Sequence, residues 1–202
     1  MPEHREDAEI YQLRVELAEI EPPIWRRFLV PSTVTLHRLH LVLQDIMGWS
    51  NYHLYRFKIG KKEYGEPNPD NEFYELHFVN SKRAKLGRTI AVEGDTFVYE
   101  YDFGDGWSHR LLLEDILKPE AGARYPICLE GGRACPPEDC GGPQGYLRFL
   151  AILANRDHEE YEQMRTWVGR SFRPTEFRVE KVNQRLRRVP TNVGGDNTQP
   201  KP

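Results

Sequence analysis

The chain of 202 residues is long enough to bury a substantial core, and 39% of its residues are hydrophobic. Its net charge of −3 argues against a protein coated in positive charge for nucleic-acid binding. No apolar run approaches the roughly 18–20 residues of a membrane span, and the N-terminus, MPEHREDAEI, lacks the apolar core of a signal peptide. We therefore expect a cytoplasmic protein without a membrane partner, whose three cysteines are reduced thiols or metal ligands.

Alternation of apolar and polar residues predicts several strands in the first part of the chain. Residues 1–9 are polar, and we expect them to be frayed. Strands are predicted at 10–17, at 24–30 after a Pro-Pro break, and at 53–59. A polar loop with two prolines is expected at 60–70.

A helix is predicted from Thr35 to Met47, because apolar residues recur there at helical spacing. Thr35 can accept a backbone N–H as the N-cap, and Gly48 suits the left-handed conformation that ends many helices. His40 falls at the edge of the apolar stripe. A histidine in such a place is more often a packing residue than a metal ligand.

Residues 96–114 predict a hairpin whose two arms meet at a Gly-Asp-Gly sequence. A two-residue turn would set Asp102 opposite His109. A three-residue loop instead sets aromatic residues and opposite charges against each other, and each such pair contributes roughly 0.2–1 kcal/mol. The predicted register therefore pairs Phe103 with Trp107, Tyr101 with His109, Tyr99 with Leu111, Phe97 with Leu113, Glu100 with Arg110 and Asp102 with Ser108. It puts Asp102 and His109 on opposite faces, which argues against both of them binding one metal ion.

The last part of the chain combines a long loop with short helices. Residues 119–142 are rich in glycine and proline and contain all three cysteines, which suggests an ordered loop pinned to the body. Pro143 fits the first position of a helix, and a second helix is predicted to open at a capping box in residues 157–160 and to close at Gly169. A last short helix is predicted near 179–189, and residues 190–202 are expected to form a disordered tail.

Four stretches of the sequence, in this order, are specific. They are Pro23 to Arg27; Thr35 to Leu54, including His40, Gln44, Gly48, Trp49 and His53; Tyr99 to His109; and Cys135 to Tyr146. Together they closely resemble the plasmid pRiA-type open-reading-frame-three-like family, also called TnpR-like passenger proteins of bacterial insertion sequences. The resemblance runs from about residue 10 to residue 189.

The resemblance implies a compact α+β domain from bacteria or archaea, sometimes encoded beside mobile elements. With the patterns above, it predicts a single domain over 10–189, built on an antiparallel or mixed sheet with a central hairpin at 96–114 and helices packed on it. The resemblance implies no activity. The label TnpR suggests a resolvase, but residues 1–40 lack the nucleophilic serine among clustered arginines that a serine recombinase needs.

Two metal sites can be formulated from the residue types. Zinc prefers three or four thiolate or imidazole ligands, and the candidates here are Cys128, Cys135, Cys140 and His109. Their spacing lacks the tight C-x2-C pair of zinc knuckles, so buried free thiols are the favoured interpretation.

The second metal hypothesis is a divalent cation used for phosphodiester or other hydrolytic chemistry. Its catalytic candidates are Asp102, Asp105, His109, Glu138 and Asp139. This site needs the Cys135–Tyr146 loop to fold over the hairpin tip. Asp105 has a simpler role in the turn, and Glu138 and Asp139 can equally cap the following helix.

Anion binding is a third hypothesis, for the helix N-terminus at Gly141, Gly142 and Pro143. Exposed backbone amides at such a position favour phosphate or carboxylate groups. Asp139 filling the position itself is the favoured interpretation.

Basic residues gather in residues 170–189, which carry seven arginines and lysines against two glutamates, a net of +5. A solvated helix face is the usual meaning of such a run. The candidates for nucleic-acid or partner contact are Arg26, Arg27, Arg178, Lys181, Arg185, Arg187 and Arg188. We expect an interaction or accessory module that contacts DNA or another protein of a mobile element, with the metal-dependent enzyme as the alternative. No cofactor is expected in the first case, and zinc or another divalent cation in the second.

Overall fold

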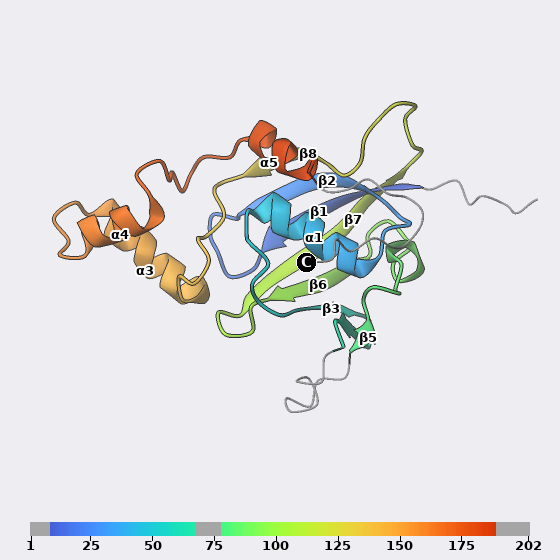
Figure 1. The fold of residues 1–202 in the computed structure, drawn as a ribbon, viewed down its shortest axis with the longest axis horizontal. Helices are drawn as coiled ribbons and strands as arrows, with labels where there is room; N and C mark the ends of the chain where they lie inside the picture. The colour runs from blue at the N-terminus through green and yellow to red at the C-terminus, as the bar shows by residue number, and fades with distance from the viewer. Residues whose placement is uncertain (1–8, 68–77, 189–202) are drawn as a thin grey trace, which may run out of the picture.

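An eight-stranded sheet organises the part of the chain that this computed structural model describes, residues 9–67 and 78–188 (Figure 1). The strand order is β5-β4-β3-β6-β7-β1-β2-β8, and all neighbours are antiparallel except β4 and β5. The strands are β1 (Ile10–Leu17), β2 (Trp25–Pro31), β3 (Tyr55–Ile59), β4 (Lys62–Gly65), β5 (Val79–Asn80), β6 (Thr96–Tyr101), β7 (Trp107–Leu117) and β8 (Ile127–Gly132). The predicted α+β fold with a mixed sheet and a central hairpin is confirmed.

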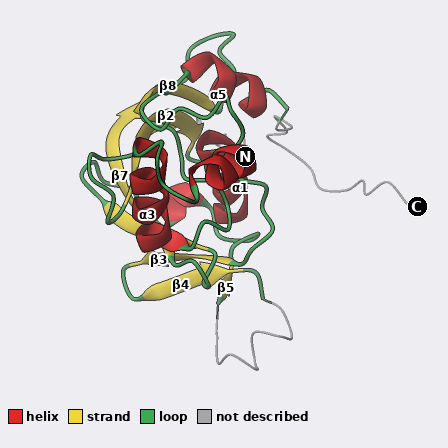
Figure 2. Cartoon of the chain, turned by 90° about the vertical axis from the view of Figure 1, so that its left-hand side faces the viewer, coloured by secondary structure: helices red, strands yellow, loops and turns green. Residues whose placement is uncertain are grey.

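Helices cover one face of this sheet and extend from one end of it. The α-helices are α1 (Leu36–Met47), α3 (Gly142–Ala154), α4 (Tyr161–Val168) and α5 (Val179–Leu186), with a 3-10 turn η1 (Leu86–Arg88). α1 lies against the sheet with α5 beside it, while α3 and α4 project to one side (Figure 1, Figure 2). None of the helices in the described ranges is long and apolar enough to cross a membrane.

The sequence determines α1 at both of its ends, as predicted. The Thr35 hydroxyl accepts a hydrogen bond from the backbone N–H of Arg38 at 3.1 Å. Gly48 adopts φ +93° and donates its N–H to the carbonyl oxygen of Gln44 at 2.7 Å. These two caps satisfy backbone groups that a helix leaves unpaired at its termini.

The two faces of the sheet differ in chemistry. The face under α1 is apolar, and Leu13 and Val15 of β1 are fully buried there. The opposite face carries charged residues, and Arg27 of β2 donates to Glu114 of β7 at 2.6 Å. This alternation is the period-two pattern of strands with one buried face, so the inward residues of the strands at 10–17 and 96–101 were readable from the sequence.

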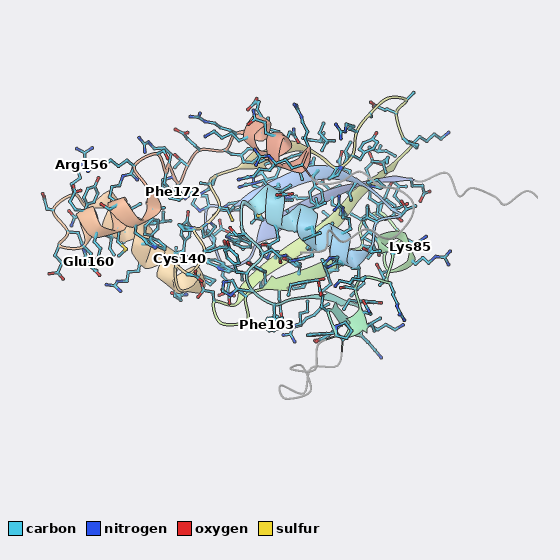
Figure 3. The ribbon with its side chains drawn as sticks, viewed as in Figure 1. Lys85, Phe103, Cys140, Arg156, Glu160 and Phe172 are labelled. Carbon is cyan, nitrogen blue, oxygen red and sulfur yellow. The ribbon has the colours of Figure 1, made fainter. Side chains whose placement is uncertain are left out.

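The predicted register of the central hairpin is wrong by two residues. Tyr101 pairs with Trp107 and Tyr99 with His109, so the connection is five residues long, not three. Asp102 causes the difference, because it adopts φ +55° and its carbonyl oxygen accepts the N–H of Gly106 at 2.6 Å. Phe103, which the prediction paired with Trp107, lies outside the ladder and is 38% exposed (Figure 3). A shift of two residues leaves the inward-facing set unchanged.

Other differences concern edge strands and a helix start. β4 lies in the predicted polar loop at 60–70, and β8 lies in the predicted irregular segment at 119–142. β8 carries apolar residues on both faces and borders only β2, so it shows no clean alternation. The predicted capping box is wrong, since α4 begins at Tyr161 without a side-chain cap. The predicted frayed segment before residue 9 and the tail at 190–202 lie outside the described residues.

A closed polar network joins α1 to the middle of the sheet. The amide nitrogen of Gln44 donates to the Tyr99 hydroxyl at 2.9 Å, so this hydroxyl donates in turn to Nδ1 of His40, 2.8 Å away. Nε2 of His40 then donates to the side-chain oxygen of Asn51 at 2.6 Å, and the Asn51 N–H donates back to Gln44 at 3.0 Å. His40 and Tyr99 are fully buried, so the network replaces the hydrogen bonds that these groups would make with water.

We expect Tyr99→Phe to lower the free energy of unfolding by about 1–3 kcal/mol, because it leaves His40 and Gln44 buried without this partner. Urea denaturation of the variant and the wild type measures the change. Tyr52→Phe is the matched control, since the Tyr52 side chain is 82% exposed and should change stability by less than about 0.5 kcal/mol. Equal stability of Tyr99→Phe and wild type would contradict the role of the network.

We also expect stability to fall as the solution is acidified below about pH 6.5. Burial lowers the pKa of His40 to about 3 and that of His109 to about 4. The unfolded chain therefore binds more protons than the folded one, and the free energy of unfolding should decline by about 1.4 kcal/mol per pH unit for each histidine between pH 6.5 and the folded pKa. Urea denaturation at pH 7.5 and 5.5 tests this, and His109→Leu should reduce the slope, with His40 and the partly buried His37 supplying the remainder. A flat profile over this range would show that these histidines do not titrate on unfolding.

Candidate functional site

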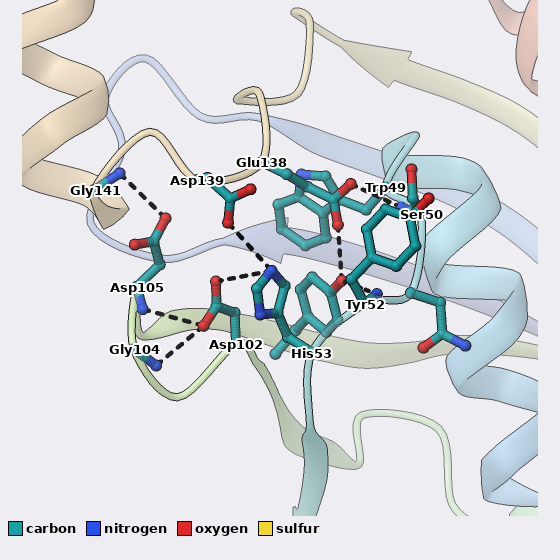
Figure 4. Close-up of polar contacts among 12 residues, drawn as sticks. Trp49, Ser50, Tyr52, His53, Asp102, Gly104, Asp105, Glu138, Asp139 and Gly141 are labelled. Atoms are coloured by element: carbon teal, nitrogen blue, oxygen red, sulfur yellow. Dashed lines mark hydrogen bonds and ion pairs between the residues drawn. The ribbon is translucent and has the colours of Figure 1, made fainter.

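Three possible metal ligands converge at the tip of the central hairpin (Figure 4). His53 comes from the segment after α1, Asp102 from the end of β6, and Asp139 from the loop between β8 and α3. One ligand atom from each lies within 4.8 Å of the other two. Nε2 of His53 is 3.2 Å from Oδ1 of Asp139 and 3.6 Å from Oδ2 of Asp102.

Asp102 is the most rigidly held of the three. Its Oδ1 accepts the backbone N–H of Gly104 at 3.0 Å and that of Asp105 at 3.3 Å. Its own N–H donates to the carbonyl oxygen of Leu54, and only 11% of its side chain is exposed. One carboxylate oxygen therefore holds the loop, and the other faces His53.

The segment that carries His53 is fixed from both sides. Asn51 belongs to the buried network below α1, and the N–H of Tyr52 donates to the Tyr101 hydroxyl at 3.1 Å. The imidazole of His53 packs edge-on against the ring of Tyr101, with 5.7 Å between ring centroids. About 31% of the His53 side chain is exposed, so its ring reaches both the carboxylates and solvent.

The cysteine-bearing loop folds over the hairpin tip, which the carboxylate hypothesis required. Glu138 accepts the Tyr101 hydroxyl at 2.8 Å and the N–H of Ser50 at 3.0 Å. Burial, and then the bond to Glu138, raises the pKa of Tyr101, so this hydroxyl stays a donor. Both oxygens of Glu138 are thus used to hold the loop in place.

The loop and the hairpin approach each other closely at a second point. The N–H of Gly141 donates to Asp105 Oδ2 at 3.2 Å, and a Cβ on Gly142 would collide with the carbonyl oxygen of Asp105. The helix N-terminus considered for anion binding is therefore occupied by Asp105, and not by Asp139 as the sequence suggested. Asp139 instead points towards His53, with 73% of its side chain exposed.

His109, a candidate in both metal hypotheses, lies outside this cluster. It is fully buried, and its Nδ1 donates to the carbonyl oxygen of Tyr99 at 3.2 Å. Its ring packs edge-on against Trp49, 5.3 Å away between centroids. His109 is therefore a core residue and does not face the carboxylates.

The three cysteines do not assemble with His109 as a zinc site. Within the described ranges, none of them belongs to a group of three or more possible metal ligands. Burial raises the pKa of Cys128 to about 11, and that of Cys135 and Cys140 to about 12. None of the three forms a disulfide; Cys128 is buried, and Cys135 and Cys140 are half-buried.

Two of the basic candidates, Arg26 and Arg27, are bonded to other groups of the protein. Arg26 is buried and donates to the carbonyl oxygens of Trp25, Ile46 and Gly132. Arg27 forms ion pairs on the outer face of the sheet. Neither guanidinium is free for nucleic acid.

The remaining basic candidates lie on α5 and beside it. Lys181, Arg187 and Arg188 are exposed, and Arg178 pairs with Glu176 at 3.0 Å. Arg185 is half-buried against Gly48 at the end of α1. In the predicted basic segment, some side chains therefore face solvent, whereas Arg185 packs between α5 and α1.

Sequence reasoning missed His53 as a functional residue and placed it in a strand. Two features of the sequence could have pointed to His53. It belongs to the Thr35–Leu54 stretch that carries the family resemblance, and it is a possible metal ligand just after a predicted helix. Its neighbours in space come from 49 and 86 residues further along the chain, so spacing along the sequence did not reveal them.

Comparison with known proteins identifies the family. A model of the plasmid pRiA4b ORF-3-like protein family matches residues 9–181. An uncharacterized protein of Sinorhizobium fredii, y4hQ, is 41% identical over 165 residues, which cover 81% of this chain and 83% of the relative. The crystal structure of a protein of unknown function from Methanosarcina mazei, MM3350, matches with a TM-score of 0.78 at 36% identity, over 86% of this chain and 97% of that chain. These relatives carry no assigned reaction, and the predicted resemblance is confirmed: the chain belongs to the plasmid pRiA4b ORF-3-like protein family.

Proposed function

We propose that the protein binds a divalent cation through His53, Asp102 and Asp139 and uses it for hydrolytic chemistry. The observation that carries this proposal is the convergence of three ligand atoms within 4.8 Å from three separate segments of the chain.

The donor set favours a particular class of metal. One imidazole nitrogen and two carboxylate oxygens suit Mn²⁺ and Zn²⁺ better than Mg²⁺, which prefers oxygen ligands alone. Three protein ligands leave further coordination positions for water or substrate, as in catalytic metal sites. The exposure of Asp139 gives solvent access to those positions.

Two features of the backbone support a functional role for the carboxylates. Asp102 and Asp139 both adopt a left-handed conformation, at φ +55° and +58°. A few per cent of non-glycine residues adopt such conformations, aspartate more often than most, and they recur at functional sites. Asp102 is also oriented by two backbone amides, in the way that outer partners fix metal ligands.

The chemistry follows from the cation. A bound divalent cation lowers the pKa of a coordinated water and polarises a phosphoryl or carbonyl oxygen. We expect the substrate to be a phosphodiester or another compound whose bond is broken by hydrolysis. Asp102 and Asp139 also supply negative charge that offsets the charge of the cation.

We expect Mn²⁺ or Zn²⁺ to bind with a stoichiometry near one per chain, measured by isothermal titration calorimetry. Asp139→Asn should weaken binding at least about tenfold, because it removes an anionic ligand with little effect on the fold. Asp157→Asn is the matched control, since Asp157 is an exposed aspartate outside the cluster. Asp102→Asn should also weaken binding, and circular dichroism will establish whether it folds.

Hydrolysis of bis(4-nitrophenyl) phosphate with and without Mn²⁺ tests the catalytic part. Activity that needs the cation and is lost in Asp139→Asn would support it. No saturable binding of either cation, or equal binding by Asp139→Asn and wild type, would overturn the metal proposal. If the cation binds but phosphodiester and ester probes are not hydrolysed, the proposal of a metal site stands and the proposal of enzymatic activity is overturned.

A second candidate is an accessory module of mobile elements that contacts DNA through α5. The favouring observation is the exposure of Lys181, Arg187 and Arg188 on one short segment. Three such charges would make three phosphate contacts, which is few for a nucleic-acid interface. The association with mobile elements rests on the family resemblance.

For this candidate we expect weak binding to duplex DNA that falls steeply with salt. Loss of Arg187 and Arg188 together should reduce the slope of log affinity against log salt by about two. Fluorescence anisotropy with a labelled duplex at several salt concentrations measures the slope. A slope that is unchanged in the double variant would exclude α5 as the DNA contact.

A further inference from the structure

A cavity lies beside the loop that carries Asp139. Its volume is about 400 Å³, and it is bounded by the end of α1, by α5, and by residues 133–138 and 168–178. Figure 1 shows residues 133–138 and 168–178 between the sheet and the α3–α4 pair, with α5 beside β8 and the end of α1. Figure 3 labels Phe172 on the segment that follows α4. The cavity lies within the usual size range of sites for small molecules.

The lining of this cavity is strongly basic. Six cationic side chains and only two carboxylates line it, a net of +4. The cations are Arg26, Arg133, Arg173, Arg178, Lys181 and Arg185. Both carboxylates are already engaged, Glu138 by Tyr101 and Ser50, and Glu176 by Arg178. Asp45 of α1 is the further carboxylate that interacts with Arg185.

Two of these arginines have unmet donors. The buried Nε atoms of Arg133 and Arg185 have no hydrogen-bond partner among the described residues. Arg133 also adopts φ +65°, an uncommon conformation for an arginine. Burial, and the nearby charge of Arg185, lower the pKa of Arg26. A buried N–H donor without a partner is costly, and an anion beside Arg133 and Arg185 would relieve that cost.

The cavity also has an apolar wall. Trp49, Phe172 and Phe177 contribute rings to it, and Val182 contributes an aliphatic surface. A free oxyanion would use only the basic part of a cavity of this volume. The combination fits an organic molecule with an anionic end.

We propose that this cavity binds a small phosphomonoester, with the phosphate at Arg133 and Arg185 and the organic part against Trp49 and Phe172. Guanidinium groups match phosphate oxygens with paired N–H donors, and a dianion offsets two of the four excess positive charges. Lys181 stands at the exposed rim of α5 and attracts the anion. The site shares no ligand with the proposed metal centre and does not depend on it.

The test is isothermal titration calorimetry with inorganic phosphate, phenyl phosphate and phenol, in a chelating buffer at about 0.15 M salt. Both phosphates should bind saturably, phenyl phosphate more tightly, and phenol should not bind. Arg133→Gln should weaken phenyl phosphate binding about tenfold, which is the fold-change for one charge-assisted hydrogen bond. Lys181→Gln should weaken it by a smaller factor, because it removes attraction at the rim and not a hydrogen bond. Arg187→Gln is the matched control, because it removes one positive charge just after α5 and outside the cavity.

Each outcome decides the proposal. Weakening by Lys181→Gln with unchanged binding by Arg187→Gln supports it, even if Arg133→Gln fails to fold. Equal weakening by Lys181→Gln and Arg187→Gln would indicate general attraction to a basic surface and would overturn the site. Binding of phosphate but not of phenyl phosphate would overturn the organic ligand. Asp139→Asn should bind phenyl phosphate as tightly as wild type does. Failure of the metal proposal can therefore be told apart from failure of the phosphate site.

Discussion

The Tyr99 hydroxyl, buried in the centre of the sheet, is the constraint on which the rest of the arrangement depends. It accepts from Gln44 and donates to His40, one turn apart on α1, so α1 can sit on the sheet in only one rotation and one register. A helix held by apolar contacts alone tolerates small shifts more easily, because those contacts are not directional. The closed network thus defines the position of the C-terminal end of α1.

That position decides where the functional residues lie. Asn51 closes the network three residues after Gly48, and the chain then has only one residue before it reaches His53. This short connection from Asn51 places the ring of His53 at the hairpin tip, and His53 itself lies outside the strands. Asp102 meets it because the left-handed turn at that residue aims its carboxylate out of the ladder.

The sequence allowed the inward residues of β1 and of the hairpin, and both caps of α1, to be predicted, since each depends on neighbours in the chain. The hairpin register was not predictable from cross-strand pairs. Three loop N–H groups bond to the side chain and carbonyl of Asp102, and they outweigh an aromatic pair at Phe103. Arg26 looked like a surface residue beside Arg27, and only the fold shows that its guanidinium donates to three backbone carbonyl groups.

The overall charge of −3 was a poor guide to the sites because opposite charges are separated across one loop. Within a few residues this loop gives Arg133 to the basic cavity and Asp139 to the acidic cluster. Glu138 lies between them, and both of its oxygens accept hydrogen bonds from neutral groups, the Tyr101 hydroxyl and the Ser50 N–H. Because its anchors are fixed by the sheet and by the end of α1, the loop keeps the two sets of charges apart, and each remains available to a ligand of opposite sign.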